Sequence, residues 1–253
     1  MNLNVELNEI NKLIDITEDS TLNIVGNKDS NLFIMIKDAT CLNINGHFNN
    51  GLIKLIIFNQ SNKNIIIKED YQVNGAYVTV AHGFFSHNDI KIDSHTRVLK
   101  GEINYETYGL IKAKLELNEL LENVLPHTSI NIKNSFVVLA NSILKTTACG
   151  SILKDAYNSS NLQATNCLTF GNLKNVEILP MLLIDENDVQ ASHSCAIGTM
   201  SELQRFYLES RGLDESQISE LITTGYVLPL TRIIESDDFT QLVLRKVQEL
   251  CLI

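Results

Sequence analysis

The chain has 253 residues, which is enough for one large domain or two small ones, each with a substantial core. Hydrophobic residues make up 44% of it and the formal net charge is −10, a composition typical of an ordinary globular protein. An acidic chain without a Lys/Arg cluster is a poor candidate for a protein that binds nucleic acid or a membrane surface, and no apolar run approaches the length of a transmembrane helix.

The first 20 residues, MNLNVELNEINKLIDITEDS, lack the basic region and apolar run of a signal peptide. The five cysteines, Cys41, Cys149, Cys167, Cys195 and Cys251, are scattered, odd in number and without a CxxC spacing. Because no export signal accompanies them, we expect reduced thiols and a cytoplasmic location.

Short apolar or alternating segments, separated by polar turn residues, follow one another from residue 20 to 193. Each has the period of a β-strand, and one occurs roughly every 10–12 residues. Only 114–125 offers a helical alternative. The predicted strands are 21–25, 31–36, 41–45, 52–58, 64–68, 76–80, 89–93, 102–105, 110–117, 129–132, 135–139, 166–170 and 175–184.

The connections between these segments favour a solenoid. A parallel sheet of βαβ units would need helices between the strands, and no convincing ones interrupt the series. Hairpin signals occur only at Asn45-Gly46 and Asn74-Gly75. Many strands without tight hairpins are typical of strands stacked in one direction through loops, although no strict sequence repeat is visible.

After residue 198 the period becomes helical. Gly212 is placed to end a first helix, and Pro229 to break a second. The predicted organisation is a short N-terminal segment (1–20), a β core (21–198) and a C-terminal helical domain (199–253). Capping-box spacings occur at Thr199/Glu202 or Ser201/Gln204, at Asp214/Gln217 and at Asp238/Gln241.

The segment DENDVQASHSCAIGTMSELQ places His193 two residues before Cys195. In extended chain these positions face the same side, so an imidazole and a thiol could together bind iron or zinc. Two ligands do not close a metal site, and a partner surface would have to complete it. The alternative is that both residues pack at the end of a strand.

Other polar clusters are weaker candidates. His82 and His87, with Asp89, could bind a metal, but a polar turn with two surface imidazoles is the preferred interpretation. Cys149 and Cys167 could approach one another across adjacent turns, or be small buried thiols. The sequence contains no P-loop, GxSxG or HExxH motif, and no catalytic constellation is predicted.

The stretch from about 145 to 226 resembles the SufB/SufD family, the core subunits of the SUF iron–sulfur assembly scaffold. The resemblance implies a right-handed parallel β-helix with a helical C-terminal domain, and a scaffold without enzymatic activity. It implies no permanently bound cofactor, but a transient iron–sulfur cluster at a subunit interface. The matching residues are Asp155-Ala156, Pro180, Asp188-Val189, Ser192-His193, Ala196, Gly198, Phe206-Tyr207-Leu208 and Ser210-Arg211-Gly212.

The family's partners are a SufB-type subunit, which pairs through the end of the β-helix, and SufC, an ABC-type ATPase that docks on the C-terminal helices. The resemblance places His193 at the interface where a nascent cluster is built, with Cys195 as an added thiol. The partner-binding candidates are Phe206, Tyr207, Arg211 and Gly212.

Two differences favour a SufD-like over a SufB-like chain. Alignment on Gly171 and Pro180 puts Lys174 where SufB-type chains carry an essential cysteine, and SufB's EHEA motif is here SHSC. The family's N-terminal helical region is expected to be largely missing. The alternatives are a degenerate SufB-like chain that forms homodimers, and a β-helix carbohydrate-active enzyme, which would need clustered carboxylates on one solenoid face.

Overall fold

The computed structural model describes residues 1–7, 11–170 and 172–251. The helices are α1 (Glu202–Ser210), α2 (Glu215–Val227) and α3 (Asp237–Cys251), with 3₁₀ turns η1 (Leu173–Asn175) and η2 (Leu228–Arg232). The strands are β1 (Asn2–Leu7), β2 (Asn11–Ile16), β3 (Ser20–Gly26), β4 (Ser30–Ile36), β5 (Cys41–Phe48), β6 (Leu52–Asn59), β7 (Ile65–Ser86), β8 (Ile90–Ile111), β9 (Lys114–Asn123), β10 (Thr128–Val138), β11 (Ile143–Ile152), β12 (Ser159–Thr169), β13 (Val176–Ile184) and β14 (Val189–Thr199).

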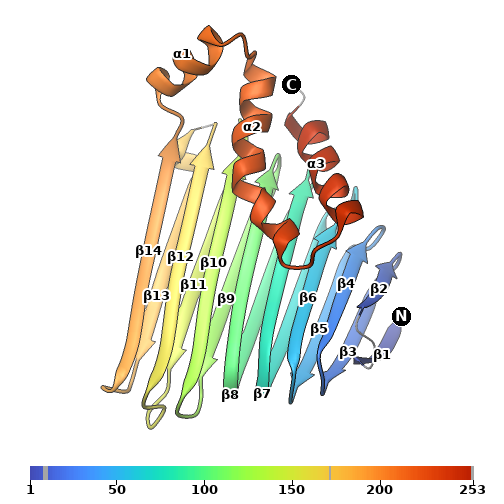
Figure 1. The fold of residues 1–253 in the computed structure, drawn as a ribbon, viewed down its shortest axis with the longest axis vertical. Coiled ribbons are helices and arrows are strands. Elements are labelled where there is room, and N and C mark those ends of the chain that lie inside the picture. The colour runs from blue at the N-terminus through green and yellow to red at the C-terminus, as the bar shows by residue number, and fades with distance from the viewer. Residues whose placement is uncertain (8–10, 171, 252–253) are drawn as a thin grey trace.

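All strand pairings among the described residues are parallel, and they build two facing layers (Figure 1). One layer, which we call the covered sheet, consists of β2, β4, β6, the second halves of β7 and β8, then β10, β12 and β14. The other, which we call the bare sheet, consists of β1, β3, β5, the first halves of β7 and β8, then β9, β11 and β13. The chain is therefore a parallel β-solenoid, as predicted.

The long strands β7 and β8 cross from one layer to the other at a corner. Their mutual register shifts between Val73 and Ala76, where Gly75 has φ +115°. Gly101 is the matching corner of β8, with φ +102°, and a Cβ there would lie 2.2 Å from the carbonyl oxygen of Ala76. Glycine fits such a corner because it lacks a Cβ and readily adopts positive φ. The predicted strands 64–68 and 76–80 are thus parts of one bent strand, β7, and 89–93 and 102–105 are parts of β8.

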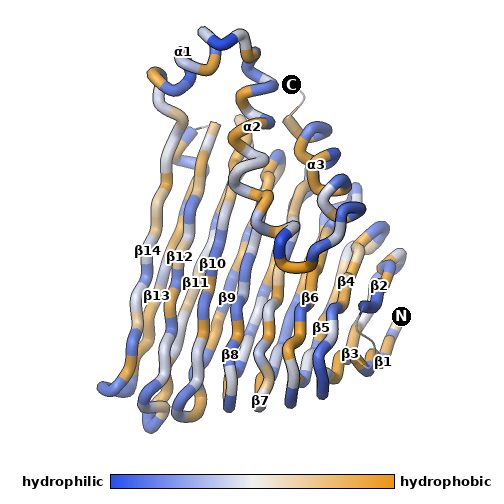
Figure 2. Tube along the Cα trace, viewed as in Figure 1, coloured by the Kyte–Doolittle hydropathy of each residue, from blue (hydrophilic) through white to orange (hydrophobic). Residues whose placement is uncertain are grey.

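The core lies between the two layers, because every second residue of each strand points inward. Strand β3 shows this directly, with Leu22 and Ile24 fully buried and the residues between them partly exposed. A second apolar cluster lies on the outside of the covered sheet, where α2, η2 and α3 pack over β6, β7, β8 and β10 (Figures 1 and 2).

Close packing holds these helices against the covered sheet. A Cβ at Gly83 would lie 2.8 Å from Cδ2 of Leu230, so the glycine allows η2 to approach the strand. Lys54 Nζ donates to the carbonyl oxygen of Ile233 at 2.8 Å, and Ser135 Oγ to that of Tyr226 at 3.0 Å. No helix in these ranges is long and apolar enough to cross a membrane.

Several boundaries differ from the sequence predictions. The helical alternative at 114–125 is wrong, because Lys114–Asn123 is strand β9, which alternates inward apolar and outward polar residues. Strands β1 and β2, within the predicted N-terminal segment, pair with β3 and β4. Strand β11 was not predicted, since its inward positions include Thr146 and Gly150 rather than an apolar series.

The helix signals are mostly confirmed. The alternative Ser201/Gln204 forms the capping box of α1, Asp214/Gln217 forms that of α2, and α2 gives way to a 3₁₀ turn at Pro229. The start of α3 is corrected, because Ser236 rather than Asp238 caps it, through a 3.3 Å bond from the backbone amide of Phe239 to Ser236 Oγ.

Candidate functional site

His193 and Cys195 lie on β14, the last strand of the covered sheet. The parallel register places His193 beside Gln163 of β12, and Cys195 beside Thr165. Gln163 and Thr165 are inward-facing and buried, so the two β14 residues occupy inward positions too. Both are nevertheless exposed, because among the described strands β14 pairs only with β12. They therefore lie at the end of the solenoid, which we call the terminal rung (β13 and β14).

A second thiol lies next to this pair. Cys167 of β12 is buried beside Ile197, one inward position beyond Thr165. Burial raises the pKa of the Cys167 thiol to about 12, and the neighbouring Cys195 contributes. Burial also raises the pKa of Cys195 itself. Without a metal or a cationic partner, both thiols therefore keep their protons at neutral pH.

Of the two alternatives for Cys149 and Cys167, the structure supports two separate buried thiols rather than an approach of one to the other. Cys149 lies in the bare sheet, beside Leu120 and Met181, whereas Cys167 lies in the covered sheet. From β8 onward, consecutive strands lie in alternate layers, so β11 pairs with β9 and β13 rather than with β12. Cys195 is the thiol that adjoins Cys167.

The metal-binding capacity of this chain's own residues is small. The ranges 1–7, 11–170 and 172–251 contain no group of three or more His, Cys, Asp or Glu side chains that could hold a metal ion. His193 and Cys195 are two potential donors, too few to close a metal site without ligands from another chain.

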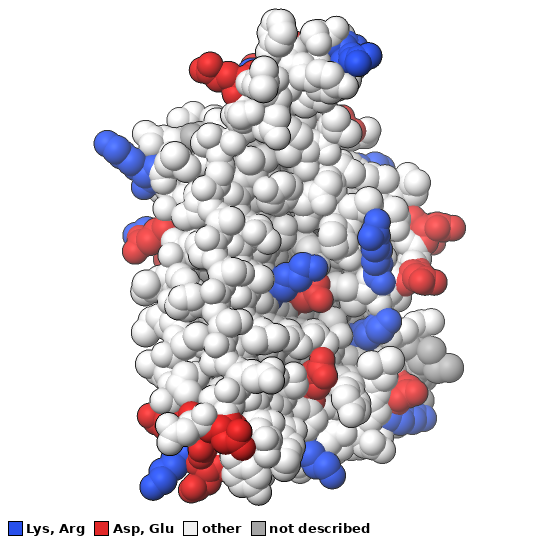
Figure 3. Space-filling model, turned by 60° about the vertical axis from the view of Figure 1, so that its left-hand side comes forward, with Lys and Arg blue, Asp and Glu red and all other residues white. Residues whose placement is uncertain are grey.

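The terminal rung also exposes an apolar surface. On β13 the outward residues Leu179, Met181 and Leu183 are exposed, and on β14 Ile197 is 42% exposed. Figure 3 turns this side of the molecule forward and shows a broad area with few charged side chains, with acidic groups gathered at its lower edge. Exposed apolar area of this kind on a strand edge is typical of an interface with another protein.

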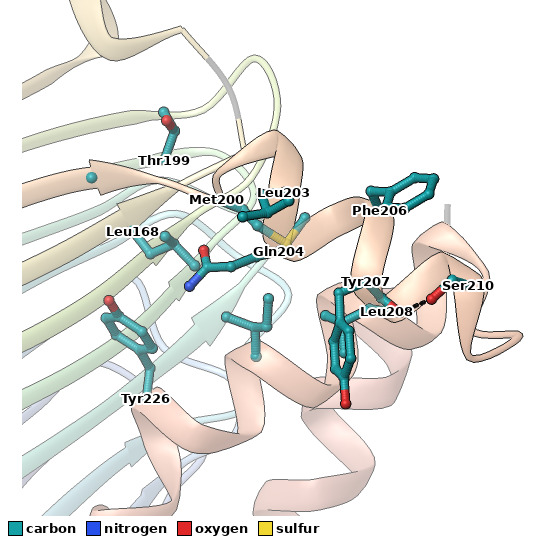
Figure 4. Close-up of a pocket in the computed structure, with 12 residues that line it drawn as sticks. Leu168, Thr199, Met200, Leu203, Gln204, Phe206, Tyr207, Leu208, Ser210 and Tyr226 are labelled. Atoms are coloured by element: carbon teal, nitrogen blue, oxygen red, sulfur yellow. Dashed lines mark hydrogen bonds between the residues drawn. The ribbon is translucent and has the colours of Figure 1, made fainter.

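Helix α1 is the second exposed feature. None of its residues is buried, and Phe206 and Tyr207 are 69% and 56% exposed. Arg205 of α1 pairs with Glu215 of α2 at 2.8 Å. Beneath α1 lies a pocket of about 980 Å³ lined mostly by apolar side chains, among them Leu168 of β12 and Tyr226 of α2 (Figure 4).

The other two partner-binding candidates differ in role. The guanidinium of Arg211 lies 5.2 Å from the ring centroid of Tyr207, a cation–π contact at the end of α1. Gly212 follows with φ +89° and has no neighbour within 4 Å of a built Cβ. It ends the helix, as predicted, through its backbone conformation rather than through a side-chain contact.

The surface-turn interpretation of His82 is wrong. His82 is fully buried inside the solenoid, and its Nε2 lies 2.8 Å from Oε1 of Glu69. His87 is exposed and does not join it. Sequence reasoning also missed Glu69 and Glu119, both buried between the layers. The available signal was a glutamate at an inward position of an otherwise apolar alternation, as in IIIKEDYQV.

Comparison with known families gives a match over residues 48–226 to the model described as "SUF system FeS cluster assembly, SufBD core domain". The match includes the terminal rung, α1 and most of α2. It also contains the bent strands β7 and β8, outside the stretch on which the sequence resemblance was based.

Curated relatives match shorter parts. The iron–sulfur cluster assembly protein SufD of Escherichia coli is 28% identical over 97 residues, 38% of this chain and 23% of the relative. SufD of Bacillus subtilis is 31% identical over 81 residues, 32% of this chain and 18% of the relative. SufB of Bacillus subtilis is 30% identical over 73 residues, which are 29% of this chain and 16% of the relative. The chain thus covers less than a quarter of each of these relatives.

Proposed function

The chain belongs to the SufB/SufD family, and from that premise we propose that it is a SufD-like scaffold subunit on which iron–sulfur clusters are assembled. The observation that carries the proposal is the terminal rung, where His193 and Cys195 are exposed at the end of a solenoid beside an apolar surface. The cluster is cargo rather than a resident cofactor.

The proposed partner at the terminal rung is a SufB-type subunit. Within residues 1–7, 11–170 and 172–251 no strand pairs with the outer edges of β13 and β14, so another chain can pair there. Leu179, Met181 and Leu183 offer apolar area that association would bury. The partner would bring the metal ligands that this chain lacks. Deprotonation of Cys195, whose thiol pKa burial raises, would then follow metal binding rather than precede it.

The proposed partner at α1 is a SufC-type ABC ATPase. The helix carries Leu203, Phe206 and Tyr207 on its surface, and the apolar pocket beneath it is open to a side chain or helix of another protein. Because α1 is linked to α2 by few contacts, such a partner could bind without disturbing the solenoid.

A SufD-like rather than SufB-like assignment is supported by Lys174, which lies exposed in η1 where SufB-type chains carry a cysteine. The carbohydrate-enzyme alternative needs free carboxylates in an array. On the bare sheet Asp93 and Glu116 instead pair with Lys91, at 3.6 and 3.4 Å. We therefore assign no catalytic step to the chain itself.

The test is anaerobic isolation of the tagged full chain from its own cells, followed by mass spectrometry and iron and sulfide analysis. We expect co-isolation of an ABC-type ATPase and of a second, homologous β-solenoid subunit. Isolation of the chain alone and without iron would overturn the proposal. Turnover of polyuronates or glycans by the purified chain would instead favour the carbohydrate enzyme.

Two variants separate the two surfaces. Leu179→Glu should lose the solenoid partner but keep the ATPase, because it places a charge only on β13. Phe206→Ser should lose the ATPase but keep the solenoid partner, because it removes apolar area only from α1. Leu13→Glu and Leu221→Ser change exposed leucines of β2 and α2, 63% and 54% exposed, that lie outside the terminal rung and α1, and both variants should retain both partners. Homodimers that persist in the absence of a SufB-type chain would favour the SufB-like alternative.

A further inference from the structure

The solenoid interior changes character along its length. Between β3 and β6 most inward positions are apolar and fully buried, with Leu22, Ile24, Leu55 and Ile57 as examples. The polar exceptions, Ser20, Ser30 and Asn59, lie at strand ends. From β7 onward polar residues enter the same positions. They are Glu69, His82, Ser94, Thr96, Thr107, Glu119, Asn134, Thr146, Asn161, Gln163 and Thr165, all of them buried.

Glu69, His82 and Tyr105, the first of these groups with the neighbouring tyrosine, are joined by hydrogen bonds. Glu69 bonds with Nε2 of His82 at 2.8 Å through Oε1, and its Oε2 accepts from the hydroxyl of Tyr105 at 2.5 Å. Burial raises the pKa of Glu69, but the charge and hydrogen bond of His82 outweigh it, with Tyr105 and Ser94 adding to them, so that the net shift is downward. Glu69 is therefore an ionised carboxylate with its own partners.

Glu119 is in a different state. Its Oε2 accepts from Nδ2 of Asn134 at 2.8 Å, but Oε1 has no hydrogen-bond partner in the part of the chain that the structure describes. Burial raises the pKa of Glu119 to about 8, the negative charge of Glu69 adds to the rise, and Asn134 and Thr107 oppose it. At neutral pH the Glu119 carboxyl is thus protonated, and its Oε1 is unpaired among the described residues.

The Glu119 side chain has neighbours in its own layer and in the facing layer. Along its own layer these are Ser94 and, one strand further, Glu69 on one side, with Ala148 on the other. The facing layer supplies Asn134, and around it lie Thr107 and Thr165. Of these groups only Glu69 is charged, so burial and that carboxylate raise the pKa of Glu119, while Asn134 and Thr107 lower it.

Further buried atoms on the adjacent rungs also lack partners among the described residues. They are Oδ1 of Asn134, Oγ1 of Thr146, Oδ1 of Asn161 and Oε1 of Gln163. Each buried unpaired oxygen of this kind costs about 1–3 kcal/mol unless water satisfies it. Internal water requires two to four polar partners, and with Oε1 of Glu119 the strands β9 to β12 carry five such unpaired oxygens.

We propose that the solenoid interior between β9 and β12 is a hydrated proton-binding site, in which internal water molecules bridge the unpaired oxygens and the Glu119 carboxyl holds the proton. The ligands are water and a proton. In the covered sheet Asn134 lies beside Thr165, and Thr165 lies beside Cys195 on the terminal rung. This row of inward positions leads from the site to the exposed end of the solenoid, through which the waters would exchange with solvent. The proposal does not depend on the iron–sulfur role.

The test is infrared spectroscopy of the full chain, comparing wild type with Glu119→Gln. We expect the wild type to show the C=O stretch of a neutral carboxylic acid at pH 7, absent from the variant, that titrates with a midpoint near 8. After mixing with D₂O the band should shift within seconds, because water reaches the carboxyl. Glu69→Gln is the matched control and should retain the band with a lower midpoint, since it removes the like charge.

Two results would overturn the proposal. Absence of a neutral carboxyl band at pH 7 would mean that Glu119 is ionised. A band that shifts in D₂O only as slowly as the core amides exchange would mean that the interior is dry. If Glu119→Gln does not fold, the titration and D₂O exchange of the wild-type band still decide between these outcomes.

Discussion

Glu69 and His82 form a fully buried pair that joins the two layers of the solenoid, with 2.8 Å between Oε1 and Nε2. Glu69 comes from the bare sheet and His82 from the covered sheet, on the two halves of the same bent strand β7. The corner at Gly75 brings the two side chains together, so the pair depends on the bend as much as on the residues.

Glu69→Gln should lower stability by about 3–5 kcal/mol, because it leaves the His82 imidazole without its buried partner. The pKa of Glu69 is lowered from 4.5, so its contribution is present above pH 4.5 and is lost as pH falls through the folded-state value. Urea unfolding of wild type and variant between pH 3 and 7 measures this. Glu177→Gln, at an exposed site, is the control. If the free energy of unfolding changes with pH in the same way in wild type and in Glu69→Gln, Glu69 does not have the lowered pKa.

Glu119→Gln should have the opposite effect. The pKa of Glu119 is raised to about 8, so the stability that its neutral form contributes is complete below pH 4.5 and is lost as pH rises from there through 8. The glutamine cannot ionise, so the variant should be more stable than wild type at pH 8, by roughly a few kcal/mol. Thermal unfolding at pH 5 and pH 8 gives the comparison. Equal pH dependence in both proteins would show that Glu119 does not titrate in this range.

Cys195 should be the first of the five cysteines to react with an alkylating reagent in the native protein. It is exposed, Cys41 is partly exposed, and Cys149, Cys167 and Cys251 are buried. Because burial raises the thiol pKa of Cys195, its rate should still be increasing with pH at pH 9. Mass spectrometry of timed samples identifies the order. Faster labelling of Cys167 than of Cys195 would contradict the placement of the terminal rung.

Leu230→Ala should destabilise the protein by about 2–5 kcal/mol, because the side chain is fully buried between η2 and the covered sheet against Gly83. Leu221→Ala, at a 54% exposed position of α2, is the control and should change stability by less than about 0.5 kcal/mol. Chemical unfolding measures both. Similar values for the two variants would mean that the C-terminal helices do not pack on the solenoid in solution.

His193→Ala should leave folding intact, because the imidazole is exposed, but should impair cluster assembly in the isolated complex if it contributes the proposed ligand. Gln190→Ala, an exposed change on the same strand, should assemble normal amounts. Iron and sulfide content per complex, with the melting temperature as the folding control, provides the measurement. A wild-type cluster yield from His193→Ala would remove the metal role of this residue.

Local patterns in the sequence account for much of the fold. Alternation of apolar residues identified most strands, and side-chain caps identified α1 and α2, because both signals depend on neighbours within a few positions. The 114–125 segment was ambiguous for the same reason: its leucines fit either period, and only pairing with β8 and β11 makes it a strand.

The candidate site was only partly accessible from the sequence. His193 and Cys195 became candidates through their spacing, and His193 also through the family motif, since both signals are local. That Cys195 adjoins Cys167, and that Cys149 does not, follows from the register of β12 with β14 and of β11 with β13. That register depends on the lengths of the turns between the strands, and the residues within one strand do not reveal it.

The sequence by itself determined the period of most strands, the ends of α1, the start of α2 and the membership of the family, because each depends on residues close together in the chain. Only the tertiary structure decided which polar residues lie inside. Glu69 is balanced by His82 and Tyr105, 13 and 36 residues away. A buried charge is tolerated only with such partners, and the solenoid supplies them from a different strand or layer.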